Sequence, residues 1–229
     1  MKRDAVTITD HRTNLEYEIP VVEGAISAME LRKIKVNPED FGLLTYDPGF
    51  TNTAACRSRI TYIDGDEGIL RYRGYPIEEL AEKSTFLEVA YLLLDGELPD
   101  ADELAKWRQD VADQAHLPAE LRKVLGGFPR DGHPMGIVIG CLAALATHHP
   151  DARDVSSADG RRLQILRILG KMPLVSAYAF RHTKGQAPFD PDPSLSYTGR
   201  FLQMVFGEEG GAYRADPVLE RALDVLFIL

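Results

Sequence analysis

Hydrophobic and polar positions alternate in two pairs of short segments near the start of the chain. Within residues 5–19 a polar, turn-like stretch interrupts the alternation, and a second pair covers residues 59–63 and 68–72. Residues 64–67, which join the second pair, contain Asp-Gly, and this dipeptide supplies the backbone freedom that a tight turn needs. We predict two small β-hairpins, separated by a loop over residues 41–57 that is rich in glycine, proline, asparagine and threonine.

From Pro76 onward the apolar residues follow a helical period. Ser84 or Thr85 begins a capping-box pattern that Glu88 completes. Pro173 falls inside the longest helical segment and predicts a kink there. The predicted helices begin at residue 76 and continue over residues 85–96, 99–115, 117–125, 133–149, 161–183, 194–206 and 216–229. The chain is therefore mostly α, with an N-terminal β-hairpin and loop region over residues 1–75 and a helical large domain over residues 76–229.

The helix predicted over residues 133–149 differs from the others in having no charged residue between positions 135 and 146. A helix that is apolar all round is buried on all sides. Gly136 and Gly140, together with the neighbouring alanines, are small enough to let another helix approach closely. Two interpretations stay open, a central core helix and a helix at a subunit interface.

The last predicted helix has no stop signal. Residues 222–229 form an apolar run without a glycine, a polar turn or a basic residue at its end. Burial of each large apolar side chain there would contribute roughly 1.5–3 kcal/mol of stabilising free energy, which is lost if the side chain is exposed. We expect the chain either to be truncated at this point or to be covered by something else.

Charge restricts the classes of partner. Lys plus Arg number 26 and Asp plus Glu number 35, which gives a formal net charge of −9. No basic tract stands out, so we expect no nucleic-acid partner. No apolar run reaches the length of a membrane span, and the first residues lead into a polar stretch with no apolar leader. We expect a cytoplasmic protein that does not contact membranes.

Two sets of residues are of the types that bind metal ions. Cys56 and Cys141 have no second ligand at metal spacing in their flanks, which argues against a zinc site. Asp64, Asp66 and Glu67 cluster as in a calcium loop, but the glycine follows the first aspartate, so the pattern of a calcium loop is not met. A hairpin turn is the better interpretation.

The remaining candidate residues form no catalytic constellation. No glycine-rich phosphate loop, zinc-protease motif or nucleophile elbow occurs. We interpret His133 as a helix cap rather than a catalytic group. His148 and His149, being adjacent, are better explained by interaction with a helix C-terminus than by chelation. A solvated face is favoured over an anion-binding patch for Arg57, Arg59, Arg71 and Arg73. The six histidines are His11, His116, His133, His148, His149 and His182.

Several long segments nevertheless resemble bacterial citrate synthases. The most specific is ITYIDGDEGILRYRGYPI at residues 60–77, preceded by TYDPGFTNTA at residues 45–54. Further matching segments follow in the same order as in the family, at residues 86–99, 130–135, 171–173 and 216–224. The resemblance covers nearly the whole chain.

The resemblance implies a mostly α-helical fold, with a large domain and a smaller mobile domain, that assembles as a dimer or a dimer-based hexamer. It places the helices that begin near residues 133 and 161 at the dimer interface. It also implies that the parent protein joins acetyl-CoA to oxaloacetate and releases citrate and CoA. An aspartate and two histidines carry this acid–base chemistry without a metal or cofactor, and arginines hold the carboxylates.

The resemblance also implies that the catalytic residues lie outside this chain. In the family a His-x-Asp-His-Glu motif directly follows the Leu-Phe-Ile-Leu with which this chain closes, and the other site residues come later. No catalytic, cofactor-binding or metal-binding residue is therefore carried over, and we expect the 229-residue chain to be inactive alone. Two alternatives stay open, a 2-methylcitrate synthase that uses propionyl-CoA and a non-catalytic, truncated dimerisation or assembly module.

Overall fold

The computed structural model describes residues 4–229, and its internal contacts divide the chain into two compact units, one up to Ser58 and the other over Arg59–Leu229. The two units are defined by their internal contacts. The division into a β-hairpin and loop region over residues 1–75 and a helical large domain over residues 76–229 stays a prediction. No described helix is long and apolar enough to cross a bilayer.

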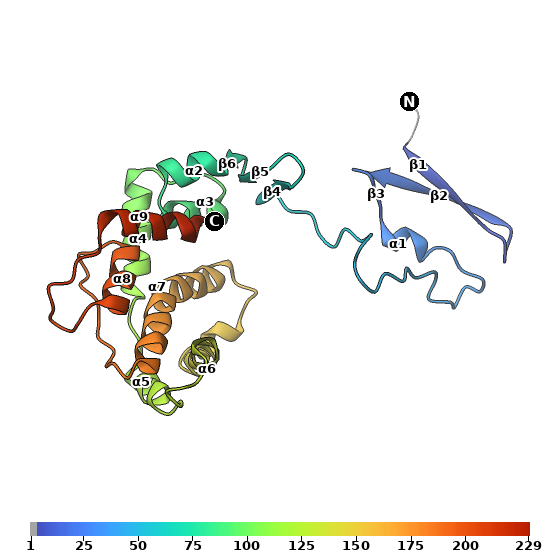
Figure 1. Cartoon of the computed structure of the whole chain (residues 1–229). Coiled ribbons are helices and arrows are strands. Elements are labelled where there is room, and N and C mark those ends of the chain that lie inside the picture. The colour runs from blue at the N-terminus through green and yellow to red at the C-terminus, as the bar shows by residue number, and fades with distance from the viewer. Residues whose placement is uncertain (1–3) are drawn as a thin grey trace. The chain divides into compact units, whose positions relative to one another are not determined.

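The N-terminal unit is built on a small antiparallel sheet (Figure 1). Strand β1 (Ala5–Asp10) pairs with β2 (Leu15–Val22) in a register that places Asp10 opposite Leu15, which confirms the first predicted hairpin. Strand β3 (Ala25–Ile26) and the short helix α1 (Ala28–Leu31) follow, and neither was predicted. Ile19, Leu31 and Ile34 form the small core of this unit.

The loop over residues 41–57 contains neither helix nor strand, as predicted. Its turn is ordered by Asp47, whose carboxylate accepts hydrogen bonds from the Thr51 and Asn52 backbone N–H groups at 3.2 and 3.1 Å and from the Thr53 hydroxyl at 2.5 Å. These bonds hold the pKa of Asp47 below its ordinary value, with the Thr53 bond as the largest cause.

The second unit begins with the other predicted hairpin. Strands β4 (Thr61–Asp64) and β5 (Ile69–Tyr72) are antiparallel, and β6 (Tyr75–Pro76) adds to β5. The Asp64 carboxylate accepts from the backbone N–H groups of Asp66 and Glu67 at 3.2 and 3.0 Å. This acidic cluster therefore closes a turn, as the hairpin interpretation predicted.

Helices make up the rest of the unit, so the predicted mostly α fold is confirmed (Figure 1). The capping box of α3 uses Thr85 rather than Ser84, because the Glu88 carboxylate accepts from the Thr85 N–H at 2.7 Å. Gly96 ends that helix with a left-handed backbone. The helices are α2 (Ile77–Lys83), α3 (Phe86–Asp95), α4 (Ala101–Asp113), α5 (Ala119–Gly126), α6 (Pro134–Thr147), the 3-10 helix η1 (Pro150–Arg153), α7 (Ala158–Thr183), α8 (Tyr197–Phe206) and α9 (Pro217–Ile228).

Helix α7 runs through the centre of this unit and packs against α4, α5, α6 and α8. Pro173 lies inside it, and Figure 1 shows the helix changing direction along its length. Because proline has no N–H, the Leu169 carbonyl one turn earlier loses its helical partner. The Tyr197 hydroxyl of α8 donates to that carbonyl at 2.8 Å and so satisfies it.

The end of α4 is held against α7 next to this proline. A side chain at Gly170 would place its Cβ 2.6 Å from the Val111 carbonyl oxygen, so only glycine allows this close approach. The Lys171 ammonium, on a side chain that is 1% exposed, donates to the Gln114 carbonyl at 2.8 Å. A cation is favourable at this helix end because the last carbonyls carry partial negative charge. Burial lowers the pKa of Lys171.

A second buried cation closes the other end of α7. Arg181 donates through Nη1 to the carbonyls of Met204 and Gly207 at 3.1 and 2.8 Å, and through Nε to Ala187 at 2.7 Å. These bonds cap the end of α8 and fix the loop that follows α7. The main core lies beside them, formed by Leu121, Leu125, Ile137, Val138, Cys141, Leu145, Leu174, Val175, Ala177, Tyr178, Ala179 and Met204.

The Lys171 bond yields a stability test. Lys171→Met keeps the apolar stem but leaves the Gln114 carbonyl without its donor, so we expect the free energy of unfolding to fall by about 1–3 kcal/mol in urea titrations. The control Lys123→Met alters an exposed lysine on α5 and should change stability by less than about 0.5 kcal/mol. Equal unfolding midpoints for the two variants would contradict the role given to Lys171.

Candidate functional site

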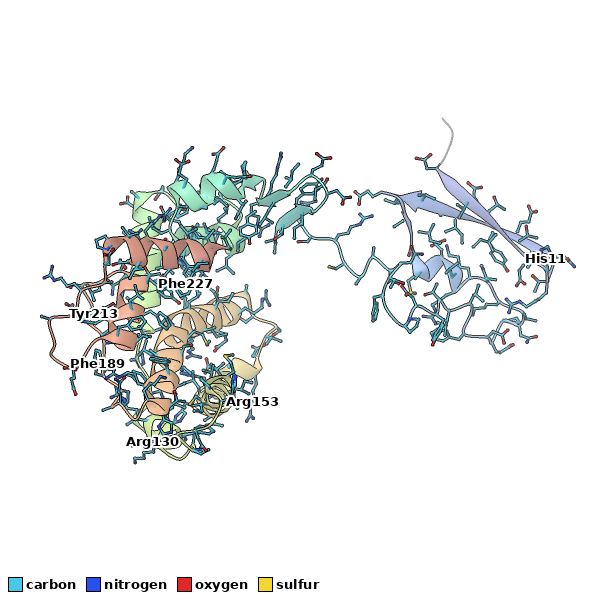
Figure 2. The ribbon with its side chains drawn as sticks, in the orientation of Figure 1. His11, Arg130, Arg153, Phe189, Tyr213 and Phe227 are labelled. Atoms are coloured by element: carbon cyan, nitrogen blue, oxygen red, sulfur yellow. The ribbon has the colours of Figure 1, made fainter. Side chains whose placement is uncertain are left out.

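The structure does not gather the six histidines into one cluster, although His148 and His149 are adjacent. His11 lies at the β1–β2 turn, as Figure 2 shows. The rings of His116 and His182 are paired with backbone carbonyls, of Asp113 at 3.0 Å and Phe128 at 2.8 Å. Within residues 4–229 no group of three or more histidine, cysteine, aspartate or glutamate side chains is placed to hold a metal ion.

His133 has the structural role that the sequence indicated. It is the N-cap of α6, and its Nδ1 accepts a hydrogen bond from the Met135 backbone N–H at 3.2 Å. Pro134 occupies the first helical position, where a missing N–H costs nothing. His133 therefore starts α6.

The pair at the other end of α6 departs from expectation in one respect. His148 is the C-cap of α6. Burial of His149, reinforced by the nearby Arg167 and Lys171 cations, lowers its pKa, which disfavours the charged form of this ring at the helix end. Its Nε2 is buried and has no hydrogen-bond partner within the described part of the chain.

The four arginines near the second hairpin have different surroundings. Arg57 belongs to the N-terminal unit, where it faces Glu23 at 3.4 Å. Arg59 and Arg71 are exposed, as expected for a solvated face. Arg73 instead donates through Nε and Nη2 to the Leu93 carbonyl at 3.3 and 2.7 Å, which ties the hairpin to the last turn of α3.

Helix α9 is anchored by a pair that the sequence analysis did not single out. Arg221 donates to the carbonyls of Ala81, Glu82 and Ser84, at the end of α2, with distances of 3.0 Å to Glu82 and 2.9 Å to Ser84. Asp224, one turn later, accepts from the Phe86 backbone N–H at 3.2 Å. A cation thus meets the negative end of one helix and a carboxylate meets the positive end of the next. In the sequence, the signal that could have indicated this pair was the spacing of three residues between the arginine and the aspartate.

Aromatic packing continues this anchor. Phe227 lies with its ring centroid 5.5 Å from that of Phe86, 6.4 Å from Tyr197 and 6.1 Å from Phe201, and Figure 2 shows it on α9 beside the other helices of the unit. Ile228 is buried beside it. The expected exposure of the last helix is therefore limited to its other face.

That other face is apolar, and so is a groove next to it. Leu226 and Leu229 are 65% and 64% exposed, and Val218 and Leu219 continue the face toward the start of α9. A cavity of about 250 Å³ opens between α3, α7 and α9 with almost entirely apolar walls, formed by Phe86, Val89, Ala90, Leu93, Leu94, Ile165, Leu169, Phe227 and Ile228.

Helix α6 corrects one expectation. Ile137, Val138 and Cys141 are buried, but Met135 and Ile139 are 57% and 64% exposed. One side of α6 packs against α5 and α7, and the other meets solvent. The prediction that this helix is buried on all sides is wrong for this chain, since no described element covers the second side. The subunit-interface interpretation stays a prediction.

Comparisons with known proteins agree with one another. The family model described as "Citrate synthase, C-terminal domain" matches residues 49–229. The chain is 45% identical over 235 residues to a citrate synthase of Dictyostelium discoideum, covering 100% of this chain and 46% of the relative. It is also 45% identical to a glyoxysomal citrate synthase of Cucurbita maxima, with 99% and 46% coverage.

Solved structures show the same similarity. Citrate synthase from Pyrobaculum aerophilum matches with a TM-score of 0.70 and 30% identity, over 85% of this chain and 50% of that one. The citrate synthase of Thermoplasma acidophilum, solved as a ternary complex with carboxymethyl coenzyme A and oxaloacetate, matches with a TM-score of 0.67 and 26% identity, over 77% of this chain and 45% of that one.

These matches define a helical domain with the fold of the acyl-condensing synthases. The chain belongs to the citrate synthase family. The Dictyostelium relative is eukaryotic, so the matches establish the family rather than its bacterial type. The chain spans about half the length of the relatives it matches, 46% for the first two. The expectation that it holds no catalytic or cofactor-binding residue stays a prediction.

The Asp224 anchor predicts a pH dependence. Burial raises the pKa of Asp224, so its contribution to stability is largest below the ordinary pKa of an aspartate and declines as pH rises through the raised value. In urea unfolding between pH 4 and pH 8, the stability of the parent chain relative to Asp224→Asn should fall as the pH rises from 4 and should level off above the raised pKa. The exposed control Asp131→Asn should track the parent chain. A difference independent of pH would contradict this assignment.

Proposed function

We propose that this chain is the scaffold half of a citrate synthase that condenses acetyl-CoA with oxaloacetate to give citrate and CoA. The observation that carries the proposal is the family match over residues 49–229, together with identity over the whole chain to a citrate synthase. The related Thermoplasma structure holds carboxymethyl coenzyme A and oxaloacetate, which supports this substrate pair. No metal or cofactor is needed for such acid–base chemistry.

We assign a supporting role to the residues described above. Arg221 and Asp224 hold α9 at the junction of α2 and α3, while Phe227 and Ile228 fill the space beneath it. In this proposal the reacting groups are supplied by sequence outside the chain, and the fixed end of α9 gives that sequence a rigid starting point.

An activity assay tests the proposal that this chain is the scaffold and that the reacting groups lie outside it. The 229-residue chain should form no citrate from acetyl-CoA and oxaloacetate, because loss of a whole acid–base set costs many orders of magnitude in rate. The full-length parent protein should form citrate and should prefer acetyl-CoA to propionyl-CoA. Citrate formation by the 229-residue chain would refute the proposal, and a preference for propionyl-CoA would identify a 2-methylcitrate synthase instead.

We further propose that the exposed side of α6 packs against a second copy of the chain, as part of a dimer or a dimer-based hexamer. Its exposed positions are apolar or small, and a side chain added at Gly136 would meet nothing within 4 Å in the isolated chain. Small residues on a helix permit a close approach by another helix. A purely structural assembly module would use the same surface.

Light scattering tests this surface. Gly136→Leu and Ile139→Asp should each shift the chain toward the monomer, because one fills the space needed by the partner and the other buries a charge. Val155→Asp, which alters an exposed side chain in the loop before α7, is the matched control and should leave the mass unchanged. A parent chain that is monomeric at all concentrations would contradict the proposal.

Location in the cytoplasm is likewise a proposal, made together with the expectation that neither nucleic acid nor a membrane is a partner. One relative carries the description glyoxysomal, so the compartment is open to test. Fractionation of cells that express the tagged parent protein decides between the two compartments.

A further inference from the structure

A polar cavity separate from the apolar groove lies between α4 and α8, next to the start of α3. Its volume is about 270 Å³. Arg108 comes to it from α4 and Arg200 from α8, so two guanidinium groups on different helices share one space. The other lining residues are Thr85, Leu87, Ser194, Leu195, Ser196, Tyr197, Thr198 and Asp224.

Arg200 is half-buried and has donors to spare. Its Nε donates to the Leu195 carbonyl at 3.0 Å, and its Nη groups have no acceptor within residues 4–229. Burial lowers the pKa of Arg200. Arg108 is exposed and forms no ion pair in the described part of the chain. The Nη groups of Arg200 therefore have no acceptor in the described part of the chain, which is unfavourable for a half-buried cation.

The hydroxyl groups around the cavity are already engaged. Ser194 donates to Asp192 at 2.7 Å, Thr85 donates to Glu88 at 2.5 Å, and Ser196 donates to Glu220. The hydroxyl of Thr198 is buried and lies 3.4 Å from that of Ser196, so the arginines supply most of the donors left for a ligand. A ligand that uses only guanidinium donors must itself be an acceptor, and an anion gains the most from them.

The one carboxylate on the cavity wall is also satisfied internally. Asp224 accepts from the Phe86 backbone N–H and from Arg221 at 3.1 Å, so its charge is directed toward α2 and α3. Glu220, near the start of α8, is bound to Ser196. These two acids still limit the size of a bound anion, because a large one would approach them.

We propose that the cavity between Arg108 and Arg200 binds a small oxyanion of the phosphate class, either free or as a phosphomonoester. A guanidinium presents paired N–H groups that match the oxygens of a phosphate, and two guanidiniums on separate helices match its two charges. The site does not depend on the proposed citrate synthase activity. Such an anion would bridge α4 and α8.

Titration calorimetry with inorganic phosphate, in a low-salt buffer free of phosphate, tests the site on the 229-residue chain. We expect one phosphate per chain, with affinity weakened at least about tenfold by Arg108→Gln and by Arg200→Gln, since each loses charged hydrogen bonds. Arg153→Gln is the control that removes the same charge elsewhere, from η1, and should bind as the parent chain does (Figure 2). A phosphomonoester that competes with phosphate would extend the site to esters.

Three results would overturn the proposal. In the first, the parent chain does not bind phosphate. In the second, all three substitutions weaken the affinity for phosphate equally. In the third, the chain binds succinate in place of phosphate. Should Arg200→Gln fail to fold, Arg108→Gln decides alone, because it changes an exposed side chain on the surface of α4.

Discussion

The bond from the buried Lys171 ammonium to the Gln114 carbonyl is the contact on which the arrangement of the helical unit depends. It joins the middle of α7 to the end of α4, at the one place where Gly170 lets the two backbones approach closely. Pro173 then bends α7 away from that contact, and its residues Leu174, Val175 and Tyr178 enter the main core with α5 and α6. A buried cation is costly unless its hydrogen bonds are made, so this junction has little freedom to shift.

The same chemistry recurs at other helix ends. Arg181 binds the last carbonyls of α8, Arg221 binds those of α2, and Arg73 binds the last turn of α3. Asp224 completes the set by meeting the first N–H of α3. Helix termini leave several backbone groups unsatisfied, and here long side chains from distant segments satisfy them. The unit is thereby held together by specific polar contacts as well as by apolar burial.

Local signals explain which parts of this structure could be predicted. The Asp-Gly turn, the Thr85 to Glu88 capping pattern and the His133 cap depend on neighbouring residues, and each appears close to its expected place. The contacts of Arg221 and Arg73 depend on partners far away in the sequence. The hydrophobic periodicity of a segment contains no information about such partners. The exposed side of α6 was misjudged because an apolar surface looks the same in sequence whether the covering element belongs to this chain or to another. The cavity at Arg108 and Arg200 was missed for a similar reason, since these two residues come to one cavity only in the folded chain.

The tyrosine that serves the Leu169 carbonyl has a consequence for motion. That carbonyl belongs to the middle of α7, whereas its donor, Tyr197, is the first residue of α8. If α8 separates from α7, the carbonyl of Leu169 loses the hydrogen bond from Tyr197, so local opening of α8 destabilises α7 beside its proline. The two helices should therefore open as one cooperative segment in native-state hydrogen exchange, rather than fraying independently.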